Sequence, residues 1–157
     1  MTDTAAAVWT ARNTAVTTLA NAAAGFRWPR DVLAEVDEGS EARAALVRAR
    51  TEYQSNVLTQ LRAYRANRNR GDATEADANI ASMIRSTRDM SATVNRVRRA
   101  INLPVLQTLE TGLTTTLDDV ARTVSTTATN YASGFGQGAG LALIVLSVGA
   151  LWWLSKK

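Results

Sequence analysis

The sequence predicts an all-α protein: an antiparallel helical bundle with heptad seams, followed by one C-terminal transmembrane helix. Three observations support this fold class. The 157 residues include only two prolines, and most of the nine glycines lie at or after residue 134, so the front of the chain has few helix breakers. Apolar residues recur at heptad spacing through the middle of the chain. No charged residue occurs between Arg122 and Lys156, and the apolar end of this stretch is long enough to enter a bilayer.

The first helix is expected to run from caps at Thr2, Asp3 and Thr4 to about residue 24. Its apolar stripe repeats every three or four residues and consists of Val8, Ala11, Ala15, Leu19, Ala22 and Phe26. Because most of these side chains are small, we expect the neighbouring helices to approach closely. Gly25 is expected to end the helix.

A corner at residues 26–29 is expected to lead into a short second helix, with Pro29 suited to its first turn. We interpret Trp28 as the side chain that fills this corner; contact with a partner is the alternative. The short helix carries Val32, Leu33 and Val36. Four acidic residues near its end lack the spacing of a calcium-binding loop, and we interpret them as a solvated turn: Glu35, Asp37, Glu38 and Glu41.

A helix hairpin is expected next. Ser40 is a suitable N-cap for a long helix that reaches about Arg70. One face of this helix carries Leu46, Ala49, Tyr53, Val57, Leu61 and Tyr64. Gly71 suits its C-terminal cap, and Asp72 with Glu75 predicts a capping box that starts the following helix.

The helix after Asp72 carries the first heptad seam. Its small and apolar residues alternate steps of three and four over four repeats: Ala73, Ala76, Ile80, Met83, Thr87, Met90, Val94, Val97 and Ile101. A repeat of seven residues favours left-handed supercoiling against another helix. We therefore predict helix–helix packing at Ile80, Met83, Met90, Val94, Val97 and Ile101.

A break at residues 102–104 separates this seam from a second one. The second seam consists of Leu106, Leu109, Leu113, Leu117, Val120, Val124, Thr127 and Tyr131. Leu106, Leu113, Leu117 and Val120 are its predicted packing residues. The two seams either close against each other within one bundle, or the second seam pairs between copies of the chain; the sequence leaves both arrangements open.

We divide the chain into a soluble helical bundle (residues 1–122), a Thr- then Gly-rich neck (123–138), a membrane anchor (139–154) and a basic tail (155–157). The anchor residues are Leu141, Leu143, Ile144, Val145, Leu146, Val148, Leu151, Trp152, Trp153 and Leu154. Tryptophans beside lysines are typical of the membrane interface. The neck and anchor share two pairs of glycines spaced for close helix packing, Gly134 with Gly138 and Gly136 with Gly140; a flexible hinge is the alternative.

The composition excludes several classes of function. The chain contains no Cys and no His, which removes thiolate chemistry and the usual general base near neutral pH. The sequence also lacks a P-loop, a dinucleotide-binding glycine motif, and a Ser or Thr nucleophile with an identifiable base. We therefore expect a protein that is not an enzyme, with no catalytic residue, no metal site and no cofactor.

Charge is concentrated in the middle of the chain. Residues 43–99 hold twelve arginines against five acidic residues. We predict that an arginine-rich surface contacts anions or a partner through Arg62, Arg65, Arg68, Arg96, Arg98 and Arg99. A solvated face is the alternative, and favourable placement of cations at helix C-termini accounts for part of the cluster.

These features predict a non-enzymatic, single-pass, tail-anchored membrane protein that acts as an oligomeric structural or tethering component. Its expected partners are the lipid bilayer and either further copies of itself or other structural proteins; nucleic acid is a partner that the sequence does not favour. The layout, a short Ala-, Thr- and Arg-rich helical chain with a Gly-rich neck and one anchor, resembles minor membrane proteins of a virion or phage that link shell and membrane. The alternatives are a membrane-active delivery or pore-forming component, such as a phage ejection protein, and an adaptor that binds anionic lipid or nucleic acid.

Overall fold

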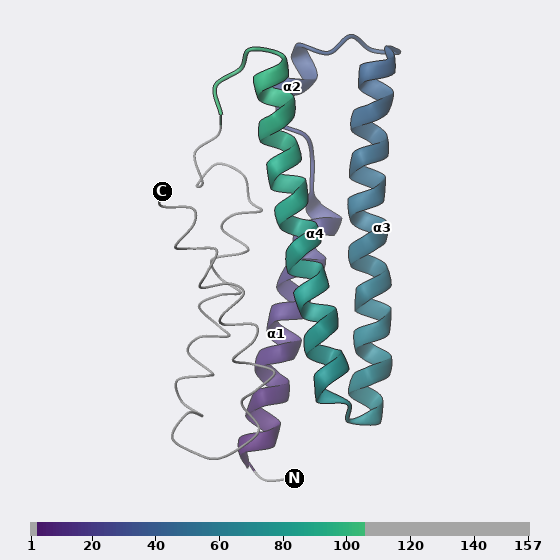
Figure 1. The fold of residues 1–157 in the computed structure, drawn as a ribbon, viewed down its shortest axis with the longest axis vertical. Coiled ribbons are helices and arrows are strands. Elements are labelled where there is room, and N and C mark those ends of the chain that lie inside the picture. Colours follow the sequence, from purple (N-terminus) through teal and green to yellow (C-terminus); the bar gives the residue numbers. More distant parts are fainter. Residues whose placement is uncertain (1–2, 106–157) are drawn as a thin grey trace.

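The computed structural model describes residues 3–105, which form a helical bundle without strands in that range (Figure 1). Three long helices pack together: α1 (Asp3–Gly25), α3 (Glu41–Arg70) and α4 (Ala73–Ala100). A short helix, α2 (Arg30–Ala34), lies in the connection between α1 and α3. The predicted all-helical bundle is therefore confirmed for this part of the chain.

The three long helices alternate in direction, as Figure 1 shows. Two side-chain contacts set their register. Tyr64 of α3 reaches Asn13 of α1, and Arg12 of α1 reaches Asp77 near the start of α4. The N-terminal half of α1 therefore lies beside the end of α3 and the start of α4, so α1 runs antiparallel to α3 and parallel to α4.

The ends of α3 and α4 follow their predicted caps. The Ser40 side chain accepts a hydrogen bond from the Arg43 amide at 3.0 Å and begins α3. Gly71 ends α3 in the left-handed region at φ 73°, and the next amide, that of Asp72, donates to the Asn67 carbonyl at 2.9 Å. Asp72 also caps α4 by accepting from the Glu75 amide at 3.1 Å. The predicted reciprocal half of the capping box does not form, because the Asp72 amide already bonds to Asn67.

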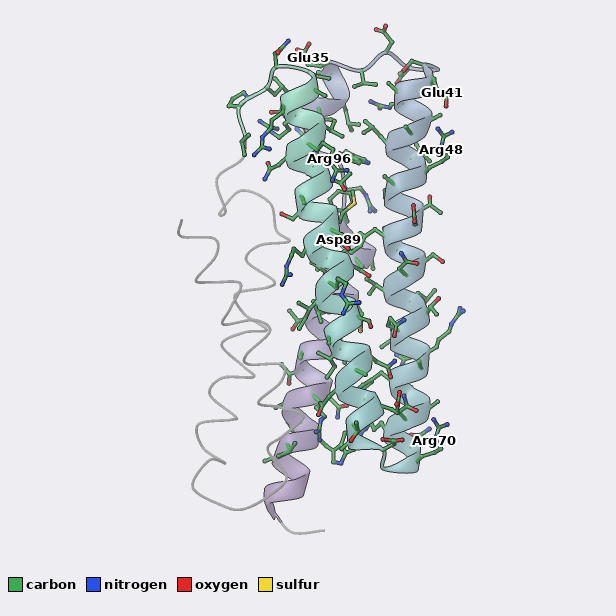
Figure 2. The ribbon with its side chains drawn as sticks, in the orientation of Figure 1. Glu35, Glu41, Arg48, Arg70, Asp89 and Arg96 are labelled. Atoms are coloured by element: carbon green, nitrogen blue, oxygen red, sulfur yellow. The ribbon has the colours of Figure 1, made fainter. Side chains whose placement is uncertain are left out.

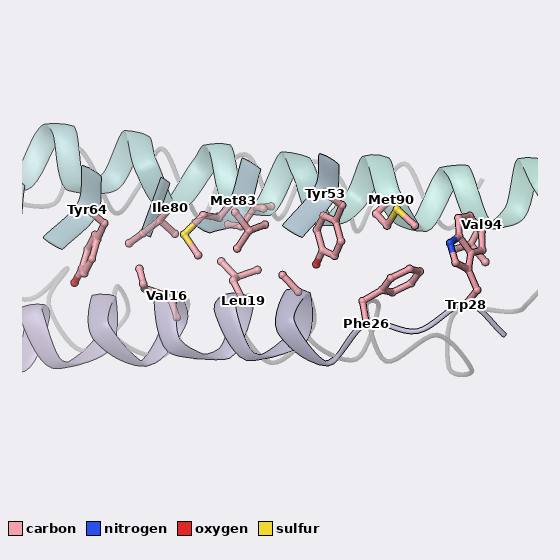
Figure 3. Packing of buried hydrophobic residues seen from close by; sticks show 14 of the residues in the cluster. Val16, Leu19, Phe26, Trp28, Tyr53, Tyr64, Ile80, Met83, Met90 and Val94 are labelled. Atoms are coloured by element: carbon pink, nitrogen blue, oxygen red, sulfur yellow. The ribbon is translucent and has the colours of Figure 1, made fainter. Parts of the chain in front are cut away.

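The first heptad seam lies in the core of the bundle (Figure 3). Ile80, Met83, Met90 and Val94 are buried, while Val97 and Ile101 are partly buried and pack against the same cluster. Figure 3 shows Val16 and Leu19 of α1 facing Ile80 and Met83. Within the described residues, the seam therefore closes inside one chain, against α1 and α3.

The buried face of α1 differs from the predicted stripe. Val16 and Ala23 are buried, whereas Val8 and Ala22 are only partly buried. The reason is that α1 contacts both α3 and α4. A helix that packs against two neighbours buries a wider arc than the single row of residues that one neighbour needs.

The connection from residue 26 to residue 36 completes the core where α1 ends (Figure 1). Trp28 is buried, and its indole N–H donates to the Leu46 carbonyl at 2.8 Å. The Phe26 ring packs edge-on against both Trp28 and Tyr53, with ring centroids 5.7 and 5.8 Å away. Trp28 therefore fills the corner. Pro29 is the N-cap of α2 instead of a residue in its first turn.

Several predictions concern residues 106–157, which lie outside the described part of the chain. They are the packing positions of the second seam, Leu106, Leu113, Leu117 and Val120; the glycines Gly134, Gly136, Gly138 and Gly140; and the anchor at 139–154. Among the helices of residues 3–105, none is long and apolar enough to cross a membrane.

Candidate functional site

The arginines of the described bundle differ in burial, and the two buried ones, Arg12 and Arg98, connect different parts of the chain. Arg12 is 5% exposed and forms a forked contact with Asp77, with Nε to Oδ1 at 2.7 Å and Nη2 to Oδ2 at 2.8 Å. The Arg12 guanidinium also lies 4.8 Å from the centre of the Trp9 ring, a favourable cation–π distance. This contact ties α1 to α4 and is closed to solvent.

Arg98 is the second buried arginine, at 3% exposure. Its Nη1 lies 2.7 Å from Asp31 Oδ2 in α2, and its Nε donates to the Pro104 carbonyl at 2.6 Å. The hydrogen bond from Arg98 holds the pKa of the Asp31 carboxyl below its ordinary value. Arg98 thus connects the chain before α3 with the chain after α4.

The prediction that Arg98 contributes to an anion-binding surface requires correction, because the guanidinium is turned inward. Arg98 follows Val94 by four residues and therefore lies on the inner side of α4. The sequence pattern that placed Val94 in the seam already contained this information. The pattern did not indicate the partner of Arg98, because Asp31 is 67 residues away in the sequence.

Three predicted contact residues lie on α3 near its C-terminal end: Arg62, Arg65 and Arg68. All three are exposed, as is Arg70 in the last turn. Arg70 also hydrogen-bonds to the Asn67 side chain. Arg68 and Arg70 lie where the helix macrodipole favours cations. We call Arg62, Arg65 and Arg68 the α3 arginine cluster.

A second exposed group runs along α4. Arg85, Arg88, Arg96 and Arg99, which we call the α4 arginine face, follow one another at steps of three, eight and three, and Ala92 fills the gap. These steps keep all five residues within one narrow arc of the helix surface. Arg85, Arg96 and Arg99 are exposed and Arg88 is half-buried. Partial burial lowers the pKa of Arg88, and neighbouring Asp89 opposes that shift.

The α3 arginine cluster lies near the Gly71 end of the hairpin, whereas the α4 arginine face runs from the middle of α4 to its other end. Figure 2 shows Arg70 at the Gly71 end and Arg96 toward the other end. A hydrogen bond between Tyr53 and Thr87, 3.2 Å long, fixes the register of α3 against α4. In this register Arg96 lies about 32 Å along the bundle from the level of Arg65, at 1.5 Å per residue. The predicted surface of six arginines is therefore two separate groups and one buried residue.

Comparison of the chain with protein-family models, curated proteins and solved structures finds no significant match. The site must therefore be interpreted from its own geometry.

The exposed arginines give the described surface groups that are suited to contact with anions. Guanidinium groups bind phosphate and carboxylate through forked hydrogen bonds and keep their charge at any physiological pH. The acidic residues near α2 are exposed, and Glu41 forms a surface ion pair with Arg48 at 2.8 Å. No group of acidic side chains within residues 3–105 is arranged to hold a metal ion.

The predicted site does not include Arg85 and Arg88, and the buried contact of Arg12 with Asp77 was not predicted. A signal for the first omission exists. Arg85, Ala92 and Arg99 are seven residues apart, which is also the spacing of the heptad seam. They therefore form a second row along α4, on the side opposite the seam. For Arg12 and Asp77, the only signal is a charged residue inside an otherwise apolar face.

Proposed function

We propose that this protein is a non-enzymatic membrane tether: a stiff helical rod held at a bilayer by the apolar segment at residues 139–154. The observation that carries the proposal is the series of buried and partly buried polar contacts that connect the helices along the bundle. Each of these contacts joins two different elements of the described chain and so fastens the helices to one another.

These contacts occur at successive levels of the rod. Near the Gly71 end, Arg12 contacts Asp77 and Tyr64 donates to Asn13 at 2.7 Å. In the middle, Gln54 donates to the Ala23 carbonyl at 2.8 Å. At the far end, Arg98 contacts Asp31. With α3 alone about 45 Å long at 1.5 Å per residue, such a rod suits a spacer between a membrane and another structure.

The sequence supplies the other half of the proposal. Residues 139–154 contain no charged residue, and two tryptophans precede the terminal lysines. A segment of this kind is favourable in hydrocarbon, whereas the bundle surface carries exposed arginines on two helices. The bundle would therefore remain in water while the segment enters the bilayer. Following the layout argued from the sequence, the setting we propose is the lipid layer of a virion.

Flotation with vesicles tests the tether. The full-length chain, reconstituted with neutral phosphatidylcholine vesicles, is expected to float with them and to resist extraction at high salt and alkaline pH. A double change, Leu143→Arg with Leu146→Arg, should release it, because each arginine at the centre of a span costs about 2.5–3.5 kcal/mol. Leu58→Arg, on the exposed surface of α3, is the matched control and should float normally.

The same vesicles separate a tether from a membrane-active delivery component. Vesicles filled with a self-quenched dye are expected to retain it when the full-length chain inserts. Dye release that rises with protein concentration would favour pore formation. Extraction of the unaltered chain by alkaline carbonate would contradict the tether itself.

A further inference from the structure

The α4 arginine face has a regular geometry. From Arg85 to Arg99 the helix advances fourteen residues, or about 21 Å, and the four guanidinium groups occur as two pairs with Ala92 between them. The helix positions of Met83, Met90 and Val94, which are buried, point to the opposite side. The arginines thus form a straight line along the outside of the rod.

No acidic residue of the described chain lies within ion-pairing distance of these four arginines. Asp89 is the one acidic residue between residues 78 and 105. The helix macrodipole accounts for Arg99, which is in the last turn, but not for Arg85 and Arg88, which lie three to four turns earlier. Asp89 lies next to Arg88 and four residues after Arg85, so it offsets part of this charge. The four arginines outnumber this one acidic residue, and a net positive charge remains on this side of α4.

We propose that the α4 arginine face docks the bundle onto the anionic lipid headgroups of the membrane that holds the chain. This inference rests on the proposed function. A straight row on the side of a rod can meet a plane along its full length, and guanidinium groups bind lipid phosphates through forked hydrogen bonds. Such a contact lays α4 along the bilayer and fixes the orientation of the rod.

The composition of α4 favours a lipid surface over single-stranded nucleic acid. Proteins that bind single strands place aromatic rings against the bases, and α4 contains no aromatic residue. The aromatic rings of the described chain belong to α1, α3 and the connection between them, for example Trp9, Trp28 and Tyr64. A face that carries arginines and no aromatic ring offers forked hydrogen bonds to phosphate groups, which a headgroup layer presents.

A reporter on the face itself tests the docking. Because the chain has no Cys, a single cysteine can be labelled uniquely. Ala92→Cys places a fluorophore in the middle of the face, and Ser55→Cys places it on the exposed surface of α3. The full-length labelled chains are reconstituted into phosphatidylcholine vesicles, with or without phosphatidylserine, that carry a headgroup-level quencher lipid.

Quenching of the Ala92 label is expected to rise when phosphatidylserine is present and to fall again at high salt, because membrane surface charge acts only within about one Debye length. The Ser55 label should respond less. Equal quenching of both labels, or no dependence on phosphatidylserine, would overturn the docking. Failure of the chain to float with either vesicle type would instead contradict the proposed tether.

Two variants of equal charge localise the effect. Arg85→Gln with Arg96→Gln and Arg99→Gln removes three exposed arginines of the α4 face. The control changes the α3 arginine cluster to glutamine and removes the same charge. Each arginine near an anionic surface strengthens binding about fivefold, so the α4 variant should weaken docking about 100-fold and the α3 variant far less.

Equal losses in the two variants would show that net charge, and not this face, drives the contact. Helical content measured by circular dichroism verifies that both variants fold. Duplex and single-stranded oligonucleotides are tested with the same proteins. Binding to either that the α4 variant abolishes, without quenching by lipid, would assign the face to nucleic acid and overturn the lipid proposal.

Discussion

Arg12 and Asp77 form a forked ion pair between α1 and α4, with both side chains at most 7% exposed. The two hydrogen bonds, 2.7 and 2.8 Å long, use both carboxylate oxygens. A buried ion pair of this kind contributes little net stability compared with apolar residues, but it strongly disfavours any arrangement in which one partner is left alone. We infer that it sets the register of α1 on the hairpin.

Breaking this pair should destabilise the bundle strongly. Asp77→Leu leaves the Arg12 charge buried without its partner and is expected to lower the free energy of unfolding by about 3–5 kcal/mol. The double change of Arg12→Met with Asp77→Leu should restore most of that loss, because no charge then remains buried. Urea unfolding of the full-length protein in mild detergent, followed by circular dichroism, measures both. A double variant as unstable as the single one would contradict this account.

Acid should weaken the contact of Asp31 with Arg98. Because the folded-state pKa of Asp31 is lowered from its ordinary value of 3.8, its contribution is fully present above that value and is lost as the pH falls through the lowered pKa. Asp31→Asn should therefore reduce the melting temperature at pH 6, and the difference should become smaller as the pH falls below 3.8. Thermal melts across that range test the sign. Asp37→Asn, an exposed acid in the same connection, is the control.

Replacing Gly71 by a residue with a Cβ atom should lower the stability of the protein. Its φ of 73° lies in the left-handed region, and a Cβ added there would meet no atom within 4 Å. Gly71→Ala is therefore expected to cost about 1–2 kcal/mol through backbone conformation alone. Gly25→Ala is the matched control, since Gly25 has an ordinary helical φ and equally open surroundings. It should leave stability unchanged or raise it slightly. Similar losses at both glycines would contradict this explanation.

The core between α1 and α4 should respond to cavity formation. Leu19 is fully buried, so Leu19→Ala is expected to cost about 2–5 kcal/mol. Leu58→Ala removes the same atoms from a side chain that is 44% exposed and should cost far less. Chemical denaturation of both variants gives the difference. Equal losses of unfolding free energy in the two variants would contradict the different burial of Leu19 and Leu58.

Local signals in the sequence were sufficient for the helices. Ser40, Gly71 and Asp72 act on amides within five residues of themselves, and each ended or began a helix as predicted. The seam at Ile80, Met83, Met90 and Val94 was also predictable, because a heptad repeat depends only on helix geometry. The buried arc of α1 was not, since its width depends on how many helices surround it.

The candidate site was predicted less well. Five of the six predicted arginines are exposed on the bundle, and their contact with an anion or a partner stays a prediction: Arg62, Arg65, Arg68, Arg96 and Arg99. The grouping was wrong, because residues on two antiparallel helices share a level only when they are equally far from the turn. Arg85 and Arg88 belong with Arg96 and Arg99 on one face, which a helical projection of α4 alone already indicates.

The sequence by itself determined where the helices of the bundle begin and end and which side of α4 is apolar, because caps, turns and periodicity act between residues close in the chain. Only the tertiary structure decided the fate of individual charges. Arg12 and Arg98 are buried because their partners lie 65 and 67 residues away, and no local pattern specifies such a distance. Electrostatic interactions depend on separation in space, so the choice between an inward ion pair and an outward anion contact is made only when the helices pack.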